Sequence, residues 1–144
     1  MDTSTVNALL KNTRCYLGTY ARDMLPSKIY RPGALIANTD PARLPGEHWV
    51  AMVFHSDGTG EYFDPYGLPP LHDEFITYMN YHCPLGWAYN PITLQCLSCV
   101  TCGHYCVLYV KFICNGKTYC DYISLFTYNN PILNDKIIRH LVNQ

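Results

Sequence analysis

The sequence predicts an α+β fold in which a small sheet, mixed or antiparallel, packs with helices around one core. The chain has 144 residues, of which 49% are hydrophobic and only 15% charged, enough apolar material for one core. Two strand-like segments flank the turn Ser56-Asp57-Gly58, a pattern typical of a hairpin. Apolar residues at helical spacing recur after residue 70. We therefore expect a single compact domain spanning residues 1–144.

The N-terminal part is expected to begin with a short helix, because Thr3 or Ser4 can cap an apolar stripe. The aromatic stretch 15–20 then leads into a loop that contains two prolines. The first strand is expected at residues 33–38.

The hairpin is the clearest structural feature of the sequence. One strand, 48–55, begins with a histidine, and the next, 61–67, carries Asp64 near its end. Antiparallel pairing around the turn places these distal ends side by side. His48 and Asp64, which are distant in sequence, are therefore predicted to be neighbours in space.

The C-terminal half predicts three helices and one or two short strands. Residues 71–81 have apolar residues at helical spacing, and 86–95 is expected to hold the strands. Residues 102–113 are mostly apolar, which indicates a buried helix. The last helix is expected at 131–142, where Pro131 suits the first turn.

Composition gives little support for nucleic-acid or membrane binding. The net charge is −1, and no Lys or Arg occurs between His48 and Val110, so the surroundings of the hairpin should be acidic. The chain lacks a signal-peptide pattern and an apolar run of membrane-spanning length, so we expect a protein that is not secreted. Because disulfides are rare in proteins that are not secreted, we expect the cysteines to be reduced. We interpret Cys15, Cys114 and Cys120 as small core residues.

Four residues have the chemistry of a cysteine protease. Cys102 supplies a thiol, His48 an imidazole to take its proton, Asp64 a carboxylate to orient the imidazole, and Gln95 an amide for the oxyanion. Cys102 would begin the buried helix, where the helix dipole lowers the pKa of a thiol. The remaining histidines are interpreted as ordinary surface or core residues: His55, His72, His82, His104 and His140.

The same cysteines support a rival hypothesis of metal binding. Cys96, Cys99, Cys102 and Cys106 have the C-x2-C-x2-C-x3-C spacing of an iron–sulfur motif, and zinc binding that includes His104 is a weaker version. The proline that usually follows the last cysteine is missing. A helix would also place the third and fourth cysteines on one face instead of around a cluster.

Several short segments resemble the adenovirus proteinase (adenain) family of DNA viruses and virus-like transposons. They are CYLGTY at 15–20, GEHWVAMVF at 46–54, EYFDPYG at 61–67, and Gln95 ahead of Cys102-Gly103. The order of these motifs is more distantly similar to that of the SUMO- and ubiquitin-like-specific proteases. Papain-type enzymes have their glutamine and cysteine first, so the order favours the adenain type.

The resemblance implies a role for each matching position. Cys102 matches the nucleophile, His48 the base, Asp64 the third member and Gln95 the oxyanion donor. It also implies that Trp49 and Gly103 bind substrate, with Trp49 helping to form a narrow channel that favours glycine before the cut.

The resemblance further implies a viral maturation protease that cuts capsid or core precursors, in the virion and in the nucleus or cytoplasm of an infected cell. The alternative within the enzyme class is a protease that removes ubiquitin-like modifiers. The chemistry needs no metal or other cofactor. Adenoviral enzymes are activated by a peptide linked through a disulfide, for which Cys83 is the candidate position, whereas stimulation by DNA has little support from the charge.

Overall fold

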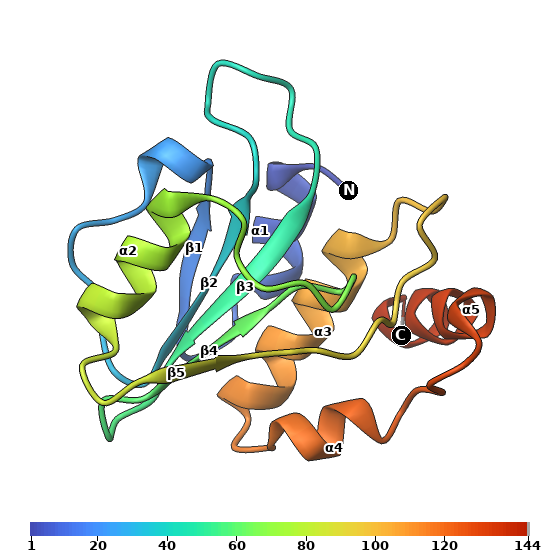
Figure 1. Ribbon diagram of the computed structural model, residues 1–144. Coiled ribbons are helices and arrows are strands. Elements are labelled where there is room, and N and C mark those ends of the chain that lie inside the picture. The colour runs from blue at the N-terminus through green and yellow to red at the C-terminus, as the bar shows by residue number, and fades with distance from the viewer. Residues whose placement is uncertain (144) are drawn as a thin grey trace.

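The computed structural model describes residues 1–143, which form a five-stranded mixed sheet with helices on both faces (Figure 1). The outer pairs β1·β2 and β4·β5 are parallel, and the inner pairs β2·β3 and β3·β4 are antiparallel. This confirms the predicted fold class. The strands, in sheet order, are β1 (Tyr16–Tyr20), β2 (Gly33–Asn38), β3 (Trp49–Phe54), β4 (Gly60–Phe63) and β5 (Trp87–Tyr89).

The helices are divided unequally between the two faces of the sheet. Helix α2 (Asp73–His82) covers one face. The long apolar helix α3 (Cys102–Cys114) covers the other, with the remaining α-helices around it. These are α1 (Thr3–Leu10), α4 (Tyr119–Ile123) and α5 (Pro131–Val142), and a short 3-10 helix, η1 (Arg22–Met24), follows β1.

Coverage on both faces explains why every residue of β2 and β3 is buried. Side chains alternate between faces along a strand. Ala51 and Val53 pack on the α3 side, whereas Val50 and Met52 pack on the α2 side. The central strands therefore appear in the sequence as continuous apolar runs.

The predicted hairpin is present, with Phe54 paired with Gly60 and Ala51 with Phe63. The N–H of His55 donates to the carbonyl of Thr59 at 2.9 Å and closes the turn. Asp64 follows the last paired residue of β4, and it therefore lies beside the beginning of β3.

Two elements were not predicted, and of the one or two strands expected at 86–95 one forms. Residues 16–20 form an edge strand, β1, whose parallel partner is more than a dozen residues away and leaves no hairpin signal in the sequence. Residues 92–95 form no strand, because their chain turns towards Pro65. Helix α4 was not predicted, although Thr118 and Asp121 form a capping box at its start.

The expectation of reduced core thiols was also wrong for all three positions named. Cys15, just before β1, forms a disulfide with Cys114 at the end of α3. Cys120 is exposed and not a core residue.

Among residues 1–143, no helix combines the length and apolarity needed to cross a membrane.

Candidate active site

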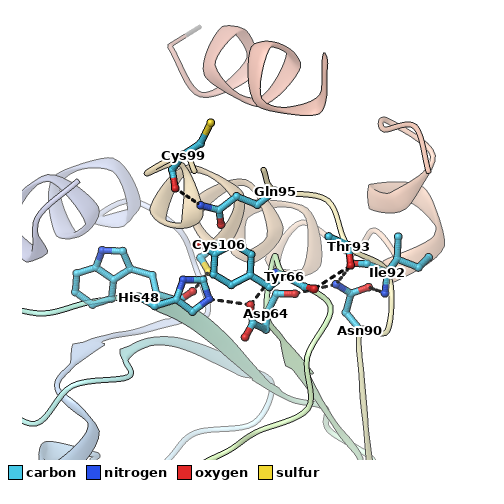
Figure 2. Close-up of polar contacts among 10 residues, drawn as sticks. His48, Asp64, Tyr66, Asn90, Ile92, Thr93, Gln95, Cys99 and Cys106 are labelled. Atoms are coloured by element: carbon cyan, nitrogen blue, oxygen red, sulfur yellow. Dashed lines mark hydrogen bonds and ion pairs between the residues drawn. The ribbon is translucent and has the colours of Figure 1, made fainter. Parts of the chain in front are cut away.

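The end of the hairpin brings His48 and Asp64 into direct contact. The Nε2–H of His48 donates to Asp64 Oδ1 at 2.8 Å, and both residues are buried (Figure 2). The same carboxylate oxygen accepts the backbone N–H of Tyr66 at 2.8 Å. The Tyr66 ring stacks on the imidazole, with centroids 4.5 Å apart. Asp64 and Tyr66 therefore fix the imidazole in one orientation.

Cys102 is the first residue of α3 and lies on the other side of the imidazole. Burial alone would raise the pKa of the Cys102 thiol, but the hydrogen bond and positive charge of His48 outweigh it, so that the pKa is lowered. Burial opposes the charge on His48 too, whereas Asp64 and Cys102 raise the pKa of His48 to about 9. The pair is therefore stabilised as thiolate and imidazolium.

Gln95 is almost completely buried beside this pair, 1% exposed. The backbone N–H groups of Leu94 and Gln95 both donate to the carbonyl of Pro65, at 2.9 and 3.1 Å, which ties this segment to the Asp64 turn. The Gln95 Nε2 donates to the carbonyl of Cys99 at 2.9 Å, as Figure 2 shows. An amide nitrogen carries two hydrogens, so one donor remains. The side-chain oxygen of Gln95 is buried without a partner.

Trp49 and Gly103 touch each other at the start of α3. A Cβ on Gly103 would lie 3.1 Å from Cδ1 of Trp49 and 3.1 Å from Cβ of Met1, so a larger residue fits at this position only if its neighbours move. The indole Nε1–H of Trp49 donates to the carbonyl of Met1 at 2.9 Å. The indole thus packs directly beside the residue that follows Cys102.

A cleft of about 510 Å³ opens onto the candidate site. His48, Trp49, Tyr66 and Cys102 line it, together with the 38–47 loop and the N-terminal residues. Three carboxylate residues, Asp2, Asp40 and Glu47, are among the lining residues, and no Lys or Arg is found among the described ones. The acidic residues of the cleft therefore precede His48 in the chain and are not those of the stretch between His48 and Val110.

Asn90 supports the carboxylate end of the site but was not singled out from the sequence. Its Nδ2 donates to the backbone carbonyls of Asp64 at 3.0 Å and Ile92 at 2.9 Å (Figure 2). Its Oδ1 accepts the N–H of Ile92 at 3.0 Å and the hydroxyl of Tyr119. An Asn before a proline predicts only a turn, so the sequence carries no signal for this role.

Asp135 supports the thiol end of the site from α5. One of its oxygens accepts the hydroxyls of Thr101 at 2.9 Å and Tyr105 at 2.7 Å, and all three residues are buried. Thr101 directly precedes Cys102, so this bond fixes the entry to α3. The sequence indicated the helix that carries Asp135 but not the partners of this residue, because they depend on the packing of α5.

The four-cysteine cluster of the rival hypothesis does not form. Cys106 points into the core and donates to the backbone carbonyl of Trp49 at 3.4 Å, while Cys102 contacts His48. Cys96 and Cys99 lie apart from both, beside α5. The helix separates the cysteines, as the i, i+4 relation of Cys102 and Cys106 predicts.

Cys83 is not accessible for a disulfide with a partner peptide. It packs in the core between the sheet and α2, 3% exposed, and a Cβ on the neighbouring Gly60 would come within 2.3 Å of its sulfur. Burial also raises the pKa of the Cys83 thiol. Both properties disfavour reaction of the Cys83 thiol, and its disulfide with an activating peptide stays a prediction.

Comparisons with known proteins give matches at the level of structure. No protein-family model and no curated sequence matches the chain. A protease of African swine fever virus (ASFV) is similar over 78% of this chain and 46% of its own, with a TM-score of 0.54 and 25% identity. The chain thus spans less than half of that protease.

Two further solved structures are similar. The central domain of an uncharacterized Legionella pneumophila protein matches over 99% of this chain and 97% of its own, with a TM-score of 0.53 and 13% identity. The C-terminal Ulp1 protease domain, solved with Smt3, the yeast orthologue of SUMO, matches over 76% and 51%, with a TM-score of 0.41 and 14% identity. The chain therefore has a fold shared with a viral protease, in agreement with its resemblance to the adenain-like cysteine proteases.

Proposed function

We propose that this chain is a cysteine endopeptidase in which Cys102 is the nucleophile. One observation carries the proposal: a buried His48–Asp64 hydrogen bond of 2.8 Å next to a thiol of lowered pKa at the first residue of a helix. If Cys102 had only a structural role, its thiol would not need a lowered pKa. The likeness to the ASFV protease supports the same chemistry.

The proposed mechanism begins with attack of the Cys102 thiolate on a peptide carbonyl carbon. The negative charge that develops on the carbonyl oxygen is stabilised by the free Nε2–H of Gln95 and the backbone N–H of Cys102. The His48 imidazolium then donates its proton to the leaving amine, and a thioester to Cys102 remains. His48, now neutral, takes a proton from water, which attacks the thioester and releases the acid product. No metal or cofactor takes part.

For the substrate, we propose viral precursor proteins that are cut next to glycine. The resemblance to the adenain family supports this, because Trp49, which lines the cleft together with Cys102, matches a tryptophan that helps to form a narrow substrate channel in that family. The resemblance to the adenain family favours precursors over ubiquitin-like conjugates. The corresponding location is the virion and the infected cell.

The first test is alkylation of the thiols with limiting iodoacetamide at pH 6, mapped by mass spectrometry. Cys102 should react faster than the exposed Cys120, because His48 outweighs burial and lowers the pKa of the Cys102 thiol. His48→Ala should abolish this advantage, whereas His55→Ala, a matched change in the same hairpin, should leave it intact. Equal labelling of both thiols in the unsubstituted protein would refute the activated nucleophile.

A second test separates the two classes of substrate. Ubiquitin and SUMO that carry a C-terminal propargylamide should not label Cys102, whereas a peptide aldehyde ending in Gly-Gly should inhibit its alkylation. Labelling by either modifier probe at Cys102 would replace the precursor hypothesis with the deconjugating one, and the protease mechanism would stand.

A further inference from the structure

A second group of thiols lies beside the candidate site and takes no part in the proposed mechanism. One sulfur each from Cys96 and Cys99 and an oxygen of Asp135 lie within 4.8 Å of one another. The cysteines come from the loop between Gln95 and α3, and the carboxylate comes from α5. In Figure 2 the sulfur of Cys99 points away from the imidazole, towards α5.

The two cysteines are held by the backbone in a tight turn. The N–H of Cys99 donates to the carbonyl of Cys96 at 3.1 Å, which closes a turn over the C-x2-C pair. This turn places both sulfurs on one side of the loop. Pairs of cysteines at this spacing provide half of the ligands in many structural zinc sites, and the other ligands come from a distant part of the chain.

The third member of the group is a carboxylate that is fixed before any ion binds. Oδ1 of Asp135 accepts the hydroxyls of Thr101 and Tyr105, Oδ2 accepts the N–H of Cys96 at a long 3.4 Å, and the thiol of Cys99 also donates to this carboxylate. The carboxylate therefore faces both cysteines. Orienting hydrogen bonds of this kind around a ligating carboxylate are typical of metal sites.

We propose that Cys96, Cys99 and Asp135 bind a zinc ion, with water in the fourth position. Tetrahedral zinc with Zn–S bonds of about 2.3 Å holds two sulfurs about 3.8 Å apart, so two sulfurs that lie within 4.8 Å of each other need to approach by at most about 1 Å. Two thiolates and a carboxylate also form a donor set that zinc prefers over Ca²⁺ or Mg²⁺. Both cysteines are half-buried, which leaves the ion a path from solvent.

The ion would act on the candidate oxyanion donor. Gln95 directly precedes Cys96 in the chain, and its Nε2 donates a hydrogen bond to the carbonyl of Cys99. Gln95 is therefore linked to both cysteines of the proposed zinc site. Bound zinc would join the loop to α5 and hold that amide in place. This consequence rests on the proposed protease function, whereas zinc binding itself does not.

The test measures Co²⁺ binding, as a probe for zinc, to the Cys102→Ala protein with the Cys15–Cys114 disulfide intact and the free thiols reduced. This background removes the His48–Cys102 pair, which is itself able to bind metal. We expect a near-ultraviolet band from charge transfer between thiolate and Co²⁺ that zinc displaces at one equivalent. The band should be lost in Cys96→Ser and Cys99→Ser and kept in the matched control Cys120→Ser. A band that is absent from the Cys102→Ala protein, or that needs Cys120, would overturn the proposal.

A second measurement needs no substitution, so it decides the matter even where a variant fails to fold. Alkylation of each cysteine in the unsubstituted protein is followed by mass spectrometry with and without zinc. At a free zinc concentration about ten times the Kd, the free fraction of the site falls about elevenfold, and alkylation of Cys96 and Cys99 should slow by the same factor. Cys120 should react at an unchanged rate. Equal rates for Cys96 and Cys99 with and without zinc would refute the site, whatever the activity of Cys102.

Discussion

At the scale of single residues, His48 and Cys102 determine each other's protonation state. The thiolate raises the pKa of the imidazole, and the imidazolium lowers the pKa of the thiol, although burial opposes both charges. Asp64 adds to the first effect through its hydrogen bond at 2.8 Å. The site is therefore in its reactive form between the two pKa values.

This coupling predicts different pH profiles for alkylation and for turnover. Alkylation of Cys102 should rise with pH as the thiolate forms, with a midpoint below the ordinary thiol value of 9.0, and then stay level. Hydrolysis of a peptide substrate should rise over the same range but fall again with a midpoint near 9, because neutral His48 has no proton for the leaving amine. Stopped-flow alkylation and a fluorogenic peptide measure the two profiles.

The variant Asp64→Asn serves as the comparison for these profiles. Loss of the carboxylate charge should move the alkaline limb of hydrolysis down by about one pH unit or more and raise the midpoint of alkylation. An alkaline limb that stays near pH 9 in Asp64→Asn would show that another group controls it.

At the scale of elements, the turn after β4 determines whether the site assembles. Gly67 has φ +76°, and its N–H donates to the Asp64 carbonyl at 2.8 Å. A Cβ at this position would lie 2.7 Å from the backbone carbon of Ile92. The close approach places the 92–95 segment against the Asp64 turn, and this contact brings Gln95 to the site.

We therefore predict that Gly67→Ala destabilises the fold more than Gly116→Ala does. Gly116 has a similar φ of +82°, but a Cβ there would have nothing within 4 Å, so its substitution costs only the backbone strain, about 1 kcal/mol. Gly67→Ala adds a backbone clash and should cost about 3 kcal/mol or more. Urea unfolding measures both values, and equal losses would mean that the 92–95 segment moves aside without cost.

At the scale of the whole molecule, a disulfide joins the residue before the edge strand β1 to the last residue of helix α3. Cys15 precedes the edge strand β1, and Cys114 ends α3, at a sequence separation of 99. Closing so large a loop reduces the conformational entropy of the unfolded chain. The bond also holds the edge strand against the helix that begins with Cys102.

Replacing both cysteines by serine should lower the free energy of unfolding by about 2–4 kcal/mol, measured by urea unfolding. Cys120→Ser is the matched control, because this thiol is exposed and free, and it should change stability by less than about 0.5 kcal/mol. If the double variant is as stable as the control, the bond contributes nothing to folding. Peptide mapping without reductant checks that the bond is present.

The sequence by itself determined the features that depend on neighbours along the chain. The apolar run 102–113 and Pro131 with its following stripe predicted two helices within one residue of their observed bounds, because helical spacing is a local property. The hairpin predicted the contact between His48 and Asp64, because antiparallel pairing around a tight turn has a fixed geometry.

Only the tertiary structure decided the features that depend on distant pairings. The edge strand β1 exists through a parallel partner, and Cys15 meets Cys114 across the fold. Asn90 and Asp135 gain their roles from the elements that pack against them, and the four crowded cysteines separate because a helix begins at Cys102. Burial of Cys83 has the same origin: a residue's exposure is set by which layers cover it, and no local pattern encodes that.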